Sequence, residues 1–112
     1  MRISLITATF NSSNVLDEMI SSLNSQTNKN YEHIIVDAVS YDDTILKLKN
    51  LLIRPPSIVS EPDSGIYNAL NKGIQRASGE YIGFLHSDDY FADDNVIFDI
   101  QAFIEREEPD IF

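Results

Sequence analysis

The sequence predicts an α/β fold, with a mostly parallel sheet of about four strands and helices on both faces. Two observations support this prediction. Short apolar runs alternate along the chain with amphipathic helical stripes, in the order β-α-β-α-β-α-β-α. The chain has 112 residues, 43% of them hydrophobic and 23% charged, which is the size and composition of one folded domain. Right-handed crossovers between parallel strands would bring all strand ends to one edge.

The first strand is expected at residues 2–9, a short β-rich run. The polar segment 11–13 follows it and offers side chains that can cap a helix. A single apolar stripe then predicts an amphipathic helix over residues 14–26. The stripe consists of Val15, Leu16, Met19, Ile20 and Leu23.

The second strand is expected at residues 31–37, whose continuous apolar run is typical of a strand covered on both faces. Asp37 ends it. An amphipathic helix over residues 45–52 follows, and Pro55-Pro56 would stop that helix. Residues 57–60 predict a third, shorter strand.

A third helix is expected over residues 66–74, with Asp63 as a candidate cap. The fourth strand lies within the run 79–89, which delivers Asp88 and Asp89 at its end. For an isolated pair of acids, the simpler interpretation is the start of a loop and the cap of the next helix. That helix is expected from about Asp93 to Arg106. Residues 110–112 resemble the start of a fifth strand, so the chain looks truncated.

Charge and composition exclude several classes of partner. The chain has 8 basic and 18 acidic residues, a net charge of −10 that opposes binding to nucleic acid or anionic lipid. It has no cysteine, which excludes disulfides and thiolate nucleophiles and fits a reducing compartment. We find no signal peptide and no segment long enough to cross a membrane, so a cytoplasmic protein is expected.

Two nucleotide-binding motifs are missing. Residues 7–12 contain no glycine, whereas a dinucleotide-binding domain opens its first helix with a glycine-rich turn. The glycine and lysine pattern of a P-loop is also missing. His33 and His86 are too far apart in sequence to suggest a helical metal pair, and His33 is expected within the sheet.

Polar residues follow every expected strand, at Thr9, Asp37, residues 60–63 and Asp88-Asp89. Such an acidic edge repels a diphosphate, because like charges about 4 Å apart cost on the order of 4 kcal/mol at an effective dielectric of about 20. A divalent cation reverses this sign. Mg²⁺ or Mn²⁺ held by one or two carboxylates would bind the phosphates and stabilise the charge of a leaving diphosphate.

Several motifs, in this order, resemble family 2 glycosyltransferases of the bacterial polysaccharide-biosynthesis type. They are Ser4-Leu5-Ile6-Thr7-Ala8-Thr9-Phe10-Asn11, Ser25-Gln26-Thr27, Tyr31 to Asp37, Ser60 to Ile74, Gly79 to Leu85 and Ser87-Asp88-Asp89. The resemblance implies a GT-A fold, in which a Rossmann-like nucleotide-binding half is joined to an acceptor half. It also implies inverting transfer of a sugar from a nucleotide-diphosphate donor, most often a UDP-sugar, to a glycan or lipid-linked acceptor.

The resemblance assigns roles to individual residues. Asp89 would ligate Mn²⁺ or Mg²⁺, and Asp88 would contact the ribose or a metal-bound water. Thr9 and Phe10 would line the nucleoside pocket, with Phe10 in position to stack on the base. Asp37 would contact the nucleoside.

Two further donor-binding candidates follow from the same segments, Asp63 beside the pocket floor and Lys72 on the third helix. One departure from the family lies after the second strand, where Ala38-Val39 replaces a second acid or a glycine. A β-branched valine disfavours positive φ, so the turn should differ there.

The resemblance places the catalytic base beyond Phe112, in the acceptor half, and therefore implies no catalytic residue within residues 1–112. These residues would be the donor-binding part of a larger enzyme, either cytoplasmic or peripheral at the inner membrane face, and would be inactive alone. They would self-associate through an exposed sheet edge or an uncovered face. Two alternatives stay open: a metal-dependent phosphoesterase using the same acids, and a non-catalytic nucleotide-binding or interaction module.

Overall fold

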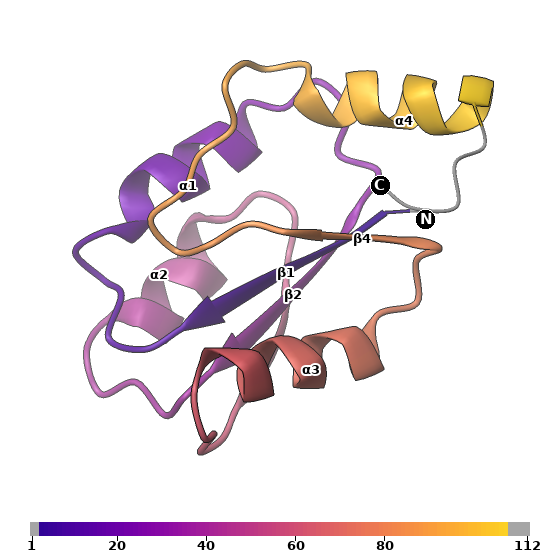
Figure 1. Cartoon of the computed structure of the whole chain (residues 1–112). Coiled ribbons are helices and arrows are strands. Elements are labelled where there is room, and N and C mark those ends of the chain that lie inside the picture. Colours follow the sequence, from indigo (N-terminus) through magenta and orange to yellow (C-terminus); the bar gives the residue numbers. More distant parts are fainter. Residues whose placement is uncertain (1–2, 108–112) are drawn as a thin grey trace.

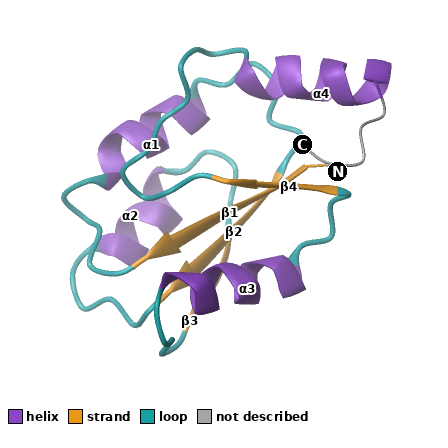
Figure 2. Ribbon diagram, in the orientation of Figure 1, coloured by secondary structure: helices purple, strands orange, loops and turns teal. Residues whose placement is uncertain are grey.

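The computed structural model describes residues 3–107 (Figure 1). Within this range, strands and helices alternate in the predicted order (Figure 2). The elements are β1 (Ile3–Thr9), α1 (Leu16–Asn24), β2 (Glu32–Asp37), α2 (Thr44–Leu51), β3 (Ser57–Ser60), α3 (Ile66–Arg76), β4 (Tyr81–Phe84) and α4 (Val96–Glu107). The fifth strand predicted at residues 110–112 lies outside the described residues. None of the helices in the described part is long and apolar enough to cross a membrane.

The four strands form one parallel sheet in the order β3-β2-β1-β4, which confirms the predicted fold class. The arrowheads of β1 and β2 point to the same edge of the sheet (Figure 1). In this register, Thr9 pairs with Asp37, and Asp37 pairs with Ser60. One polar residue from each of three adjacent strands therefore stands in a row at the carboxyl edge.

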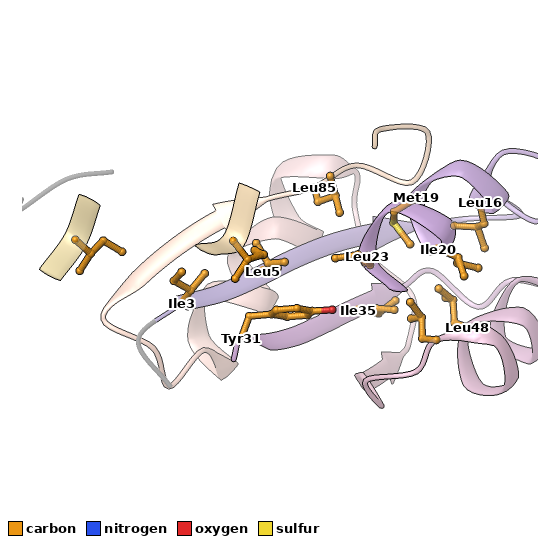
Figure 3. Close-up of a cluster of buried hydrophobic side chains, with 13 residues drawn as sticks. Ile3, Leu5, Leu16, Met19, Ile20, Leu23, Tyr31, Ile35, Leu48 and Leu85 are labelled. Carbon is orange, nitrogen blue, oxygen red and sulfur yellow. The ribbon is translucent and has the colours of Figure 1, made fainter. Parts of the chain in front are cut away.

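Helices cover both faces of the sheet, and α3 lies across it from α1 and α4 (Figure 1). The larger core joins α1, α2 and α4 to one face, with Tyr31 and Ile35 among the side chains from the sheet region (Figure 3). Full burial of a leucine or isoleucine contributes about 1.5–3 kcal/mol. This cluster of thirteen buried residues is therefore the main source of stability for the framework that carries the strand ends.

The second face of the sheet packs against α3. Ile6, Ile34, Val36 and Ala69 form the smaller core there. A Cβ atom on Gly73 of α3 would lie 2.4 Å from Cγ2 of Ile6, so only glycine allows this approach of helix to strand.

Both sequence-based predictions of a helix cap are wrong. The helix α1 begins at Leu16 after Val15, without a side-chain cap, because Asn11 Oδ1 accepts from Tyr41 N and Ser12 Oγ accepts from Phe10 N instead. The helix α3 is preceded by Gly65 with a φ of 125°, and Asp63 accepts a 3.0 Å hydrogen bond from Gly65 N instead of capping the helix. The strand β4 is also shorter than the predicted run, because it ends at Phe84.

Candidate functional site

A cleft of about 770 Å³ opens at the carboxyl edge of the sheet, where β1 and β2 end beside the start of α3. This volume falls in the range of small-molecule binding sites in proteins. Most lining side chains are small or apolar, and the polar ones come from Thr9, Asp63 and Ser64. The lining residues are Ala8, Thr9, Phe10, Ala38, Val39, Pro62, Asp63, Ser64, Gly65, Ile66 and Ala69.

Behind this cleft, Asp37 is fully buried and accepts hydrogen bonds from three segments. Its Oδ1 accepts from Thr9 Oγ1 at 2.7 Å and from Ser40 Oγ at 2.5 Å. Its Oδ2 accepts from Ser40 N at 2.8 Å and from Ser60 Oγ at 2.9 Å. A carboxylate offers about four acceptor positions, so these four hydrogen bonds occupy all of them. Asp37 therefore ties the ends of β1, β2 and β3 to the loop that follows β2.

The same hydrogen bonds set the charge state of Asp37. Burial alone would raise the pKa of this carboxyl, but the hydrogen bonds from Ser40, Thr9 and Ser60 outweigh burial and hold the pKa below its ordinary value. The group is therefore ionised at neutral pH, and its charge is balanced by donors rather than by a cation.

The loops after β1 and β2 are joined by further hydrogen bonds. Asn11 N donates to Ser40 Oγ at 2.8 Å, and Tyr41 N donates to Asn11 Oδ1 at 3.0 Å. Ser12 N donates to Thr44 Oγ1 at 2.8 Å. Together with the Asp37 bonds, these contacts fix the two loops as one unit that carries Phe10 and Val39 into the cleft.

Val39 has a φ of 56°, which is sterically unfavourable for a β-branched side chain. The sequence predicts that valine would disfavour positive φ here, but the hydrogen bonds on either side of Val39 impose it. Its side chain is 51% exposed and lines the cleft. Phe10 is 57% exposed on the same cleft and packs edge-on against Tyr41, with ring centroids 6.2 Å apart. An exposed aromatic ring beside a cleft is a platform for a planar ligand.

Asp88 and Asp89 lie in the loop after β4, at the same edge of the sheet as the cleft but not among its lining residues. Both side chains are exposed. The backbone N of Leu85 donates to Ile6 O at 3.0 Å, after which Asp89 N donates to His86 O at 3.0 Å. His86 N donates back to Asp89 Oδ2 at 3.2 Å, so a closed turn presents the acid pair.

Two adjacent carboxylates can supply part of the coordination shell of a divalent cation, and a bound ligand can supply the rest. Within residues 3–107, no three His, Cys, Asp or Glu side chains come together as a metal site. Mg²⁺ is commonly held by only one or two carboxylates together with substrate phosphates. Asp88 and Asp89 supply that number of carboxylates, and both are exposed to solvent.

The remaining candidates have different surroundings. Asp63 lines the cleft, and its Oδ1 accepts a hydrogen bond from Gly65 N. The ammonium of Lys72 lies 3.1 Å from Glu61 Oε1 and donates to Pro62 O at 2.7 Å, so it holds the loop before α3.

The structure gathers Thr9, Phe10 and Asp63 in the cleft, but it brings neither Asp37 nor the acid pair into the lining. Sequence reasoning missed Ser40 as a partner of Asp37. A partial signal was present, because aspartate side chains often bond to the backbone of the turn that follows them. His33 lies in β2, as predicted, with Nε2 2.9 Å from Thr7 Oγ1.

The glycosyl transferase family 2 domain matches residues 4–112 of the chain. An uncharacterised glycosyltransferase of Mycobacterium tuberculosis is 38% identical over 96 residues, which cover 85% of this chain and 37% of that protein. The chain spans from 37% to 43% of the length of the curated relatives it matches.

Solved structures match at the level of fold as well. The Staphylococcus aureus TarS structure in complex with UDP-GlcNAc has a TM-score of 0.83 and 29% identity, and covers 96% of this chain and 32% of that chain. A mannosyltransferase of Pyrobaculum calidifontis, in complex with GDP-Man and Mn²⁺, has a TM-score of 0.78 and covers 92% of this chain and 32% of that chain. At 20% identity, the second match shows the fold alone.

Proposed function

Since the chain belongs to glycosyl transferase family 2, we propose that it is the donor-binding part of an enzyme that uses a nucleotide-diphosphate sugar. The donor would be a UDP-sugar, held through Mn²⁺ or Mg²⁺. The sugar would pass with inversion to a glycan or lipid-linked acceptor. The acceptor half would lie outside residues 1–112.

The observation that carries the proposal is the pairing of two features on one edge of the sheet. The cleft at the ends of β1 and β2 has the size and apolar lining that suit a nucleoside. The exposed acid pair follows β4, the other neighbour of β1. A nucleoside diphosphate that fills the cleft and extends its phosphates toward β4 would use both features.

In this proposal, Phe10 stacks on the base and Val39 forms the opposite side of the nucleoside pocket. Thr9 contributes to the cleft and also donates to Asp37. Asp37 acts on the nucleoside mainly by ordering these loops, because a direct contact would have to replace one of the bonds its carboxylate already accepts. Asp37 would therefore contribute to donor affinity by holding the pocket in its binding conformation before the donor arrives.

Asp89 would ligate the cation, and Asp88 would contact the ribose or a metal-bound water. When bound, the cation would neutralise the diphosphate and stabilise the negative charge of the departing nucleotide. Asp63 would lie beside the nucleoside at the cleft floor. Lys72 would act on the donor indirectly, since its ammonium already holds Glu61 and the Pro62 carbonyl.

Inverting transfer requires a base that removes the proton of the acceptor hydroxyl. We propose that this base lies beyond Phe112. The chain alone would then bind donor without transferring sugar, and sugar transfer by residues 1–112 to an added acceptor would contradict this assignment.

The proposal is tested by titrating UDP into the chain by calorimetry, with and without Mn²⁺. Binding that Mn²⁺ strengthens, and that Asp89→Ala loses, is the expected result. Asp99→Ala, which removes one acidic charge from α4, is the matched control and should bind as the wild type does.

The two alternatives predict different outcomes in the same experiment. A metal-dependent phosphoesterase would release phosphate or nucleotide from the donor without an acceptor, which product analysis after the titration would detect. A non-catalytic binding module would bind UDP but would still transfer no sugar in a longer chain that includes the acceptor half.

A further inference from the structure

Gln26 is buried at 1% exposure, although it carries a polar amide. It comes from the Ser25-Gln26-Thr27 segment after α1, which belongs neither to the lining of the cleft nor to the acid pair. Buried amides are costly unless their hydrogen-bonding capacity is satisfied. The partners of this side chain therefore indicate its role.

All three of those partners are backbone groups. Its Nε2 donates to Asp93 O at 2.7 Å and to Ser22 O at 3.1 Å. Its Oε1 accepts from Ile97 N at 3.1 Å, which is an N–H of the first turn of α4. Gln26 thus fastens the end of α1 to the segment that leads from the acid pair into α4.

Neighbouring residues add to this attachment. Thr27 N donates to Asp94 O at 2.8 Å, and Phe91 N donates to Ser22 Oγ at 3.1 Å. In Figure 1 the chain between β4 and α4 passes beside α1, which brings these distant segments together. On the other side of the acid pair, Leu85 N is bonded to Ile6 O. The loop is therefore fixed at both ends, with Asp88 and Asp89 between the two attachments.

The composition of the loop makes this attachment necessary. Residues 85–95 contain no helix or strand, and they include four acidic residues, Asp88, Asp89, Asp93 and Asp94. Their mutual repulsion favours an open loop. An uncharged amide can hold the backbone of such a loop without neutralising the acids, and it leaves their carboxylates for a cation.

We propose that Gln26 is a positioning residue for the metal site: its amide fixes the loop after β4 so that Asp88 and Asp89 face the phosphates of a bound nucleotide. This inference rests on the proposed function, because it takes the acid pair as the cation ligands. It assigns no contact between Gln26 and the donor.

The test compares Gln26→Met, which keeps the length and removes all three hydrogen bonds, with Leu48→Ala. Leu48 is buried on α2 and makes no side-chain hydrogen bond to the loop, so this variant controls for a loss of core packing. Each protein is titrated with UDP in the presence and absence of Mn²⁺. We expect Gln26→Met to reduce the Mn²⁺-dependent gain in UDP affinity about tenfold, as loss of outer-shell partners does at metal sites, with metal-free UDP affinity unchanged.

Two results would overturn the inference. One is an unchanged Mn²⁺-dependent gain in Gln26→Met. The other is an equal loss of metal-free and metal-dependent binding, as expected for Leu48→Ala if it weakens the whole fold. Should Gln26→Met fail to fold, Ser22→Ala takes its place, because it removes the acceptor of Phe91 N at the same attachment and otherwise only the bond that Ser22 Oγ donates to Met19 O.

Amide hydrogen exchange separates failure of this inference from failure of the proposed function, because it needs no ligand. In Gln26→Met, the amides of His86 and Asp89 should exchange faster, while that of Ser40 stays as in the wild type. If the wild type shows no effect of Mn²⁺ on UDP binding, the metal-binding function fails and the exchange rates still decide the role of Gln26. Unchanged rates at His86 and Asp89 would show that Gln26 does not position the loop.

Discussion

Thr9 Oγ1 donates a 2.7 Å hydrogen bond to Asp37 Oδ1 across a register pair at the carboxyl ends of β1 and β2. Thr9 lines the cleft, whereas Asp37 lies behind it. The bond therefore connects the wall of the proposed nucleoside pocket to the buried carboxylate that joins three strands.

Asp37→Asn should lower the free energy of unfolding by about 1–3 kcal/mol, the cost of leaving a buried donor without its acceptor. The amide nitrogen of asparagine cannot accept the bond from Ser40 N. Urea denaturation measures the change. Asp43→Asn, at an exposed acid with no side-chain hydrogen bond to α2, is the control and should change stability little. Equal stability of the two variants would contradict the role given to Asp37.

The buried His33 should make the fold sensitive to mild acid. Burial lowers the pKa of His33 from 6.5 to about 4. Between these two pH values, His33 is protonated in the unfolded chain but neutral in the folded chain. Stability is fully present above pH 6.5 and falls as the pH drops toward 4, by about 3 kcal/mol at most. The double variant Thr7→Val, His33→Leu should flatten this part of the curve. An identical slope in both proteins would exclude His33 as its cause.

Asp37 acts in a lower pH range. Because its pKa lies below the ordinary value for aspartate, its contribution is present above about pH 4 and is lost as the pH falls further. The stability profile of Asp37→Asn should therefore differ in slope from that of the wild type below pH 4. Chemical denaturation at a series of pH values distinguishes this range from that of His33.

Val39→Gly should stabilise the chain by about 1 kcal/mol, because relief of the strained φ outweighs the entropy that glycine adds to the unfolded state. The variant Val39→Ala keeps a Cβ at the same φ of 56° and should gain less. Thermal denaturation of the three proteins gives the order. A lower melting temperature for the glycine variant would mean that packing of the valine side chain matters more than its backbone strain.

Gly73→Ala should cost about 1–3 kcal/mol, since its Cβ would lie 2.4 Å from Ile6 Cγ2 in a packed core. Gly83→Ala is the matched control, because its Cβ would meet only the flexible end of Leu5 at 3.2 Å. The two free energies of unfolding compare a clash with the branched part of the Ile6 side chain with a contact at the end of the Leu5 side chain. Equal costs would show that α3 can shift away from β1.

The chain should associate with itself at high concentration through β4. Among the described strands, β4 pairs only with β1, and Phe84 on it is 48% exposed. Exposed apolar side chains at the edge of a sheet tend to recruit another chain. Sedimentation at increasing concentration should show association in the wild type and less in Phe84→Lys. A wild-type chain that stays monomeric at every concentration would exclude self-association through β4.

The order of elements could be predicted because each carries a local signal. Periodic apolar residues marked α1 to α4, and strand runs marked β1 to β4, so the parallel sheet followed from connection rules. The side-chain caps predicted for α1 and α3 were wrong. Asn11 and Ser12 looked like caps, but their backbone amides bond to the loop after β2, which lies far away in sequence.

The candidate site was predictable in its position and only partly in its contacts. Thr9 and Asp37 were identified because both end strands, yet nothing local showed that Asp37 would be buried with its acceptors filled. That depends on the register that sets Ser60 beside it. The role of Gln26 was equally hidden, since its partners Asp93 and Ile97 follow it by about seventy residues.

The most direct test of the proposed donor site is the NMR spectrum of the ¹⁵N-labelled chain with UDP and a small amount of Mn²⁺. The proposal predicts shifts of the Phe10, Val39 and Gly65 amides with UDP. It also predicts Mn²⁺ broadening that is strongest at Asp88 and Asp89 and that Asp89→Ala abolishes. Broadening centred on other acids, or shifts that bypass the cleft, would contradict a donor site at this edge of the sheet.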